Sequence, residues 1–565
     1  MFKRNELMKK RILLCCIITS VFSLQAYASN RCLDHIDALV KNNRLDLSFC
    51  ELEAKDVSFV VNYLNQHPAI QSLDLTWNTK IGSAGAIALS KTTTINELII
   101  PATHVDSAGA KAIANNPFIT KLDISWNDDI SDEGGIALAN DIHLKSLDIS
   151  LTKCTDKTAI AFAKNTSLQD LNIGYNSDIT DAGVMALAGN VAIQSLDISD
   201  AKVTNAGVQA LAKNPHLKKL ILDWAPLNKD SVIALANNKN LTSLSLFRSN
   251  IGDEGAIILA GNRAITELDL TDNSIHLQGA LAIADLPLLT TLSFRQSIVA
   301  GDKNHIDDQA AIALAKLPSL IDLNLNGADI TSIGASALAQ NQHLQSLDLM
   351  GTLTDDDAMT AFAENKSIKT LILFFTNITD KGLVALSHNT SIEDLELNFK
   401  RFGGEGEGVK SLAKMKSLKT FFTFNTRLNY QDIDALAQSS SITELRLESS
   451  NLSDEDASCL AQNTHLKILD LIDNHIGDAG AIDLSKNVTL NELYLDLNRI
   501  GSKGIEALEA NPNFIHLGID DPDGGNLKTK EILQAKKMGL NKKELRRYQM
   551  YCKHHANQLE FCKKV

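Results

Sequence analysis

The chain has 565 residues, of which 44% are hydrophobic and 22% are charged, and its formal net charge is −14. An acidic chain is poorly suited to nucleic acid as its main partner, because binding phosphates requires neutralising cations. The length suggests several globular domains, unless the chain is a repeat array that grows along one axis and escapes the usual limit on core size.

The N-terminus has the three parts of a secretory signal peptide. A basic stretch ending at Arg11 precedes a short apolar run, 12–24, and an Ala26-Tyr27-Ala28 cleavage pattern. The run falls short of the about 20 apolar residues that a membrane-spanning helix needs. We expect residues 1–28 to be a cleaved signal peptide, with an uncleaved anchor as the alternative. The mature protein is then expected to be secreted, periplasmic or on the cell surface, without a transmembrane anchor.

A hexad of the form L-x-x-L-x-L recurs about every 24 residues from Leu45 to Leu517. Apolar residues on either side of a polar one have the period of a half-buried strand, and the pattern yields twenty candidate strands. The segments between them, such as 181–190 and 253–262, have the polar caps, small residues and leucines of helices. One such unit cannot bury its own apolar face, so the units are expected to stack.

This recurrence resembles the leucine-rich repeats of ribonuclease-inhibitor-like proteins over about residues 41–520. The resemblance implies an α/β fold: a right-handed solenoid, or horseshoe, of about 20 repeats, each of about 24–25 residues, with parallel strands on the concave side and helices on the convex side. We expect an N-terminal cap over 29–50, the solenoid over 51–520 and a basic helical C-terminal cap over 521–565. Such a scaffold is expected to act as a monomer that binds another protein.

Two kinds of unit, which differ in length by one residue, alternate between Leu73 and Leu196, and this alternation resembles the two repeat classes of that family. The longer units carry Asn78, Asn127 and Asn176 at one loop position. A stacked loop must satisfy its buried backbone amides, so we expect these side chains to bond the neighbouring turn. Later members of the same position are Asn273, Asn474 and Asn498.

Cysteines cluster at the two ends of the chain once the leader is removed. Solenoid ends expose core that needs covering, and an exported protein can staple its caps by disulfides. We therefore predict the pairs Cys32–Cys50 and Cys552–Cys562. Cys154 and Cys459 stand alone within repeats and are predicted to be small buried residues.

Charge is divided unevenly between the body and the tail. Residues 526–565 hold eleven Lys or Arg against three Glu, a balance of +8, and the leader carries +4, which leaves −26 on residues 29–525. The tail is predicted to be a solvated capping helix. Contact with an anionic surface, or with the horseshoe itself, remains the alternative.

Aspartate recurs between the two strand leucines, where side chains are expected on the concave face. Neighbouring carboxylates about 4.8 Å apart repel each other, so some factor must offset that cost. One hypothesis is repeat duplication that keeps the sheet soluble; the other is an acidic trough for a basic partner. The positions are Asp46, Asp74, Asp123, Asp148, Asp197, Asp269, Asp348 and Asp470, with Glu396.

Aromatic residues recur at one uniform spacing, two positions after the second strand leucine of alternate repeats: Trp77, Trp126, Tyr175 and Trp224. We expect one row, with neighbours about 10 Å apart, where strands turn into loops. The row either braces the loops or forms a binding hot spot beside the carboxylates. The predicted protein-binding site is Asp74, Trp77, Asp123, Trp126, Asp148, Tyr175, Asp197 and Trp224. Longer loops at 298–306 and 402–408 are further candidates, with neutral drift as the alternative.

The sequence contains few candidate catalytic motifs, and we expect no enzyme activity, no metal and no cofactor. The glycines of 403–408 lack the Lys-Ser/Thr of a phosphate loop, and 520–526 lacks the closing Glu of a calcium loop. The leader, the small repeats and the few cysteines resemble leucine-rich-repeat proteins that intracellular bacterial pathogens direct at host cells. Two rivals are a glycan- or peptidoglycan-binding module and the recognition part of a ubiquitin-ligase-type effector. The latter would need a catalytic domain within 526–565, which is too short a segment to hold one.

Overall fold

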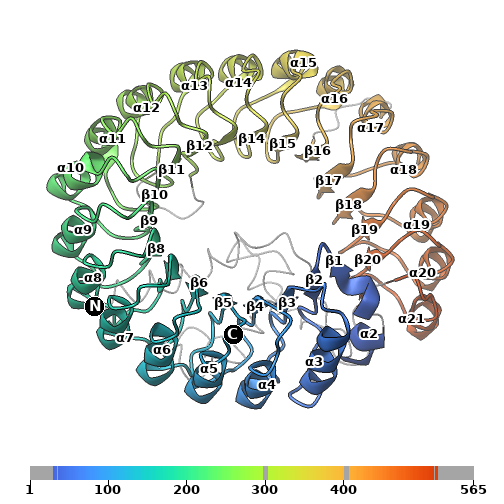
Figure 1. Cartoon of the computed structure of the whole chain (residues 1–565). Coiled ribbons are helices and arrows are strands. Elements are labelled where there is room, and N and C mark those ends of the chain that lie inside the picture. Colours follow the sequence, from blue (N-terminus) through green and yellow to red (C-terminus); the bar gives the residue numbers. More distant parts are fainter. Residues whose placement is uncertain (1–28, 35, 297–302, 400–405, 515, 520–565) are drawn as a thin grey trace, which may run out of the picture.

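The protein is a right-handed α/β solenoid that curves into a ring, with strands lining the inside and helices on the outside (Figure 1). The computed structural model describes residues 29–519 except 35, 297–302, 400–405 and 515. The signal peptide, Cys552 and Cys562, the basic tail and most of both long loops lie outside the described residues. Segment 520–526, which lacks the closing Glu of a calcium loop, does so as well.

Short strands form one sheet, in which each repeat adds one parallel strand. Equivalent leucines lie in register, so that Leu73 pairs with Leu45 on one side and with Leu98 on the other. The first strand, absent from the sequence prediction, pairs antiparallel with the second. The strands are β1 (Val40–Lys41), β2 (Arg44–Asp46), β3 (Ser72–Asp74), β4 (Glu97–Ile99), β5 (Lys121–Asp123), β6 (Ser146–Asp148), β7 (Asp170–Asn172), β8 (Ser195–Asp197), β9 (Lys219–Ile221), β10 (Ser243–Ser245), β11 (Glu267–Asp269), β12 (Thr291–Ser293), β13 (Asp322–Asn324), β14 (Ser346–Asp348), β15 (Thr370–Leu373), β16 (Asp394–Leu397), β17 (Thr420–Phe424), β18 (Glu444–Glu448), β19 (Ile468–Asp470), β20 (Glu492–Tyr494) and β21 (His516–Gly518).

The helices pack side by side on the convex face, and one continuous apolar core fills the space between them and the sheet. In several helices a glycine faces the preceding helix: a Cβ at Gly109 or Gly183 would lie 2.9 or 2.8 Å from the Cβ of Ala86 or Ala159, so the missing side chain allows the close spacing. They are α2 (Ser29–Asp34), α3 (Val57–Gln66), α4 (Gly82–Leu89), α5 (Ser107–Ile113), α6 (Asp132–Ala139), α7 (Asp156–Phe162), α8 (Asp181–Leu187), α9 (Asn205–Leu211), α10 (Lys229–Asn237), α11 (Gly252–Leu259), α12 (Leu277–Ile283), α13 (Asp308–Leu314), α14 (Ser332–Ala339), α15 (Asp356–Glu364), α16 (Asp380–Leu386), α17 (Glu407–Leu412), α18 (Tyr430–Ala437), α19 (Asp454–Leu460), α20 (Asp478–Leu484) and α21 (Ser502–Glu509), with a 3₁₀ turn η1 (Ile36–Leu39).

The loop asparagines bond the neighbouring turn, which confirms the prediction. The Asn127 Oδ1 atom accepts hydrogen bonds from the backbone N–H groups of Thr103 and Val105, at 3.1 and 3.0 Å. Its Nδ2 atom donates to the carbonyls of Ile100 and Ile124, each at 3.0 Å. The same role falls to Asn78, Asn176, Asn273, Asn474 and Asn498, and to Asn304 after the long unit.

A second asparagine ladder runs along the opposite edge, where each helix turns into the next strand. The Asn365 Nδ2 atom donates to the carbonyls of Ala339 and Asn341 in the preceding repeat, at 2.8 and 2.9 Å. Its Oδ1 atom accepts from the N–H groups of Ser367 and Ile368, both at 2.8 Å. The helices therefore end before these asparagines rather than at them: α8 ends at Leu187 and α11 at Leu259. The ladder comprises Asn116, Asn165, Asn190, Asn214, Asn238, Asn262, Asn341, Asn365, Asn389, Asn463, Asn487 and Asn511.

Aspartates at the helix starts cap the helix of the next repeat. The Asp156 Oδ1 atom accepts from the N–H groups of Thr180 and Gly183, at 2.7 and 3.0 Å, and Oδ2 accepts from the Thr180 hydroxyl at 2.7 Å. A carboxylate there satisfies unpaired N–H groups and faces the positive end of the helix dipole. Asp132, Asp181, Asp253, Asp308, Asp356, Asp454 and Asp478 act alike. Much of the negative charge of the body is therefore structural.

The two ends of the array meet, so the curvature exceeds that of an open horseshoe (Figure 1). The Lys41 ammonium, on β1, lies 3.5 Å from the Glu492 carboxylate, on β20. Among the described residues no strand pairs across this junction, and the sheet remains open. The N-terminal end is covered by α2, where a disulfide joins Cys32 to Cys50 with their Cα atoms 6.0 Å apart.

Candidate functional site

The inner face of the ring carries a band of carboxylates that we call the acidic row: Asp74, Asp123, Asp148, Asp197, Asp223 and Asp269. Five of them end strands, and each of these five uses Oδ1 to close its own strand. In Asp123, Oδ1 accepts from the Ser125 N–H at 3.0 Å and from the Ser125 hydroxyl at 2.7 Å. The recurrent Asp-x-Ser/Thr pattern is thus a local turn that leaves the second carboxylate oxygen for other contacts.

Burial raises the pKa values of the acidic row, and mutual repulsion adds to the effect. The pKa of Asp123 rises to about 7 through burial and the nearby Asp148 carboxylate. Burial raises the pKa of Asp197 to about 6, and burial together with Asp269 raises that of Asp223 to about 8. Near pH 7 the row therefore carries only part of its formal negative charge, because Asp123 is about half ionised and Asp223 is mostly protonated, and each further ionisation costs free energy.

Cations only partly compensate the acidic row. Arg44 forms an ion pair with Asp74 and hydrogen-bonds to it. In the described parts of the chain, no Lys or Arg nitrogen lies within 4.0 Å of the carboxylates of Asp123, Asp148 or Asp197. Their hydrogen bonds come from neutral groups, such as the Asn172 amide, which donates to Asp148 at 2.7 Å. The row can therefore accept a basic ligand.

The later strands have a mixed inner face. The pKa of Glu396 rises to about 7 through burial and the adjacent Asp394 carboxylate. Here, however, Arg446 supplies a guanidinium paired with Glu444. The ring of Phe422, at the same strand position, packs edge-on against Phe374 with centroids 5.0 Å apart. Asp123, Asp148 and Asp197, which have raised pKa values and no ion pair within the part of the chain that the structure describes, thus lie together on β5 to β8.

Three aromatic side chains form a contiguous surface beside the acidic row, which we call the aromatic ledge: Phe49, Trp77 and Trp126. The rings of Phe49 and Trp77 stack with centroids 6.3 Å apart, and those of Trp77 and Trp126 are also 6.3 Å apart. The sequence predicted neighbours about 10 Å apart, but the two indole centroids are closer, and the repeat between them has only the small Ala102 at this turn. All three rings are half-buried.

The ledge residues occupy a strained backbone position. Phe49, Trp77 and Trp126 have φ values of 58°, 62° and 58°, in the left-handed region. Other repeats place Gly327 and Gly351 at this turn, and the region costs bulky residues about 1–2 kcal/mol. Most other repeats also hold a non-glycine residue with positive φ at this turn, including Ala102, Leu151 and Leu497, so the conformation belongs to the repeat and does not by itself assign a role to the aromatic rings.

Trp224 differs from the rest of its row because it is buried, with 8% of its surface exposed. Its ring packs edge-on against Phe247 at 5.0 Å, and the Arg248 guanidinium covers it at 4.5 Å. That guanidinium pairs in turn with Asp272 at 2.7 Å. Of the two hypotheses for the aromatic row, bracing of the loop therefore fits Trp224, while the ledge presents Trp77 and Trp126. Tyr175 is half-buried between the two groups.

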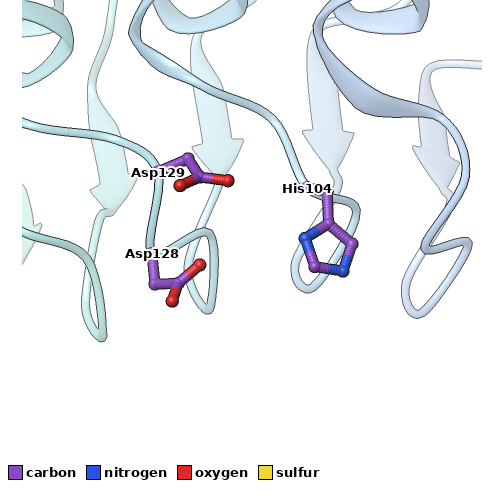
Figure 2. A group of neighbouring side chains, drawn as sticks. All are labelled: His104, Asp128 and Asp129. Atoms are coloured by element: carbon purple, nitrogen blue, oxygen red, sulfur yellow. The ribbon is translucent and has the colours of Figure 1, made fainter. Parts of the chain in front are cut away.

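Figure 2 shows another cluster, on the loops that follow β4 and β5: His104, Asp128 and Asp129. One ligand-type atom from each lies within 4.8 Å of the others. Asp129 also lies 3.9 Å from the Lys153 ammonium, and similar pairs recur along this edge, as between Lys202 and Asp178 at 3.0 Å. The cluster is one step of an exposed ladder of opposite charges, which explains it without a metal.

Two residues of this surface escaped the sequence prediction. Asp223 lies one position beyond the strand leucines, and its Oδ1 atom accepts from the Ser245 hydroxyl and the Phe247 N–H of the next repeat. Phe49 follows Leu47 at the same offset as Trp77 follows Leu75, so aligning the irregular first repeat would have revealed it. Both unpaired cysteines within the repeats were predicted to be buried. Cys154 is buried, whereas Cys459 is only half-buried.

A family model described as "Leucine Rich repeat" matches eleven segments of the chain: 66–90, 115–139, 164–188, 190–212, 237–260, 261–284, 316–339, 364–387, 438–461, 462–485 and 486–508. The chain is a leucine-rich-repeat protein. Proteins of this kind are typically non-enzymatic scaffolds that bind other proteins. Within the described residues, no helix is both long and apolar enough to span a bilayer.

Solved structures resemble the chain at low sequence identity, and no curated protein matches the sequence. An internalin (inlF) from Listeria monocytogenes is 18% identical, with 74% of this chain and 89% of that chain covered and a TM-score of 0.31. The match in the yeast complex of Rad7 and Elc1 is 18% identical, covers 67% of this chain and 94% of that chain, and has a TM-score of 0.44. The match in the mouse RP105/MD-1 complex is 16% identical, covers 82% of this chain and 80% of that chain, and has a TM-score of 0.42.

Proposed function

We propose that this leucine-rich-repeat protein is an exported, non-enzymatic scaffold that binds a basic segment of another protein through its inner face. The observation that supports this proposal is the acidic row, whose carboxylates have raised pKa values and few cationic partners. Lys or Arg side chains of a ligand would offset the repulsion between these carboxylates. Binding would therefore lower an unfavourable electrostatic free energy that remains in the folded protein.

Export is part of the proposal and rests on two features. Residues 1–28 have the pattern of a signal peptide, and the disulfide between Cys32 and Cys50 fits an oxidising compartment. The leader and the repeats also resemble bacterial leucine-rich-repeat proteins directed at host cells, so we propose a host protein as the partner. Fractionation of the producing cells tests this: retention of the uncleaved chain in the cytosol would contradict export.

Affinity capture tests the basic partner. We expect the double variant Asp123→Lys/Asp148→Lys to lose the basic proteins that the unaltered chain captures from host lysate. A matched control, Glu133→Lys/Glu254→Lys, makes the same charge change at two convex side chains that are each 67% exposed. This control should retain them. Equal capture by all three proteins would refute binding at the acidic row.

The aromatic ledge supports a second candidate, a glycan-binding surface. The half-buried rings of Trp77 and Trp126 suit the apolar faces of sugar rings, and the carboxylates nearby accept hydrogen bonds such as those of sugar hydroxyls. Titration of the tryptophan fluorescence with peptidoglycan fragments and with a basic peptide separates the two. Quenching by glycan alone, lost in Trp77→Ala/Trp126→Ala, would favour the glycan and contradict the protein partner.

A further inference from the structure

The contact between the two ends converts the concave face into the inside of a ring. Lys41 on β1 meets Glu492 on β20, and Tyr494 donates a hydrogen bond from its hydroxyl to the same carboxylate at 2.8 Å. His516, on β21, interacts electrostatically with Glu492 and Asp46, so charged residues of the first and last repeats form one cluster. Residues almost the whole array apart in sequence are therefore neighbours.

The number of strands sets the size of this ring. Parallel strands lie about 4.8 Å apart, so the 21 strands give a circumference of about 100 Å and a diameter of about 32 Å between strand backbones. Side chains project inward from all sides and reduce the free width to about 20 Å. The curvature comes from the repeats themselves, and the single exposed ion pair at the junction adds little, since such pairs are worth at most about 1 kcal/mol.

This width separates two kinds of partner. An α-helix with its side chains is about 10–12 Å across and fits. A folded domain of about 100 residues has a radius of gyration of about 13 Å and is about 33 Å across, so it does not fit. An open horseshoe of the same length would accept such a domain, because its ends would stand apart.

We infer that the ring takes up a single Lys- or Arg-rich helix or hairpin along its inner face and excludes intact folded domains. This inference rests on the proposed function and specifies the form of its partner. Basic side chains of the segment would pair with the acidic row, and apolar side chains would contact the aromatic ledge at the rim. Binding thus requires a protruding element of the partner rather than a flat surface.

Cross-linking tests the ring without any ligand. In a full-length Cys459→Ser background, Lys41→Cys/Glu492→Cys should be joined by a bismaleimide with a short spacer, and peptide mass spectrometry identifies the link. The matched control is Lys41→Cys/Glu267→Cys, whose second cysteine lies on β11 across the ring; we expect no link within one molecule. Failure of the first pair to cross-link would overturn the ring, whether or not a basic ligand binds.

Binding to the cross-linked ring tests the size limit. A helical peptide of about 20 residues, rich in Lys and Ala, should bind at low salt, with about tenfold weaker affinity when Asp123 and Asp148 are changed to Asn. Lysozyme, a basic folded protein, should not compete with the peptide. Competition by lysozyme would overturn the exclusion of domains. If the cross-link forms but the peptide does not bind, the proposed basic partner is wrong. The inference that the partner supplies a helix or hairpin is then wrong as well, while the ring itself is confirmed.

Discussion

Removing charge from the acidic row is expected to stabilise the protein near neutral pH. Asparagine at position 123 can keep the hydrogen bonds that Asp123 accepts from Ser125, at 3.0 and 2.7 Å, and removes only the charge. A pKa raised from 3.8 to about 7 corresponds to roughly 4 kcal/mol at 1.36 kcal/mol per pKa unit. Because the Asp123 side chain is half-buried rather than fully buried, and part of the shift comes from the neighbouring Asp148 carboxylate, we expect about 1–2 kcal/mol.

The sign follows from proton binding. A carboxyl group whose pKa is higher in the folded state binds protons more tightly when folded, so its stabilising contribution is present below pH 4 and is lost as the pH rises through 7. The gain of Asp123→Asn should therefore be present at pH 8 and nearly absent at pH 4. Asp197→Asn should behave alike, with its transition near pH 6.

Hydrogen exchange of the β5 and β6 amides measures the local opening free energy, in which each tenfold change in protection corresponds to about 1.4 kcal/mol. We expect slower exchange in Asp123→Asn than in the unaltered chain at pH 8. Asp156→Asn is the matched control with the opposite sign. Its carboxylate faces the positive end of a helix dipole and accepts the Thr180 hydroxyl through Oδ2, so removing the charge should cost about 1 kcal/mol. Faster exchange in Asp123→Asn at pH 8 would show that the acidic row serves folding, and would refute the reasoning.

Three further predictions concern stability. Asn365→Ala should cost about 3–4 kcal/mol in opening free energy by hydrogen exchange, because four hydrogen bonds are lost; a cost below about 1 kcal/mol would contradict the ladder. In urea unfolding, Trp224→Ala should cost about 3 kcal/mol, while Trp77→Ala on the half-buried ledge should cost about 1 kcal/mol; equal costs would remove the distinction between them. Mass spectrometry of non-reduced peptides should show Cys32 bonded to Cys50, and Cys32→Ser/Cys50→Ser should lower stability by about 3 kcal/mol; free thiols in the exported protein would refute the pairing.

The candidate site was only partly visible in the sequence. Asp123 and Trp77 could be placed on the inner face and at the loop edge because each is at a fixed offset from a strand leucine. The offset could not reveal that Trp224 is covered by Arg248, since that contact depends on the side chain of the next repeat. Nor could it show that Asp223 belongs to the acidic row.

By itself the sequence determined the solenoid, because a unit that exposes an apolar face must stack on its neighbours, and the spacing of the leucines sets strand, register and inner face. The loop asparagines followed from the same local logic. Only the tertiary structure decided the rest: a small rotation at each repeat, invisible in any one unit, accumulates over 21 strands until Lys41 meets Glu492. The pKa of each carboxyl group likewise depends on its burial and on neighbours from other repeats. The repulsion within the acidic row could therefore be recognised only from the folded structure.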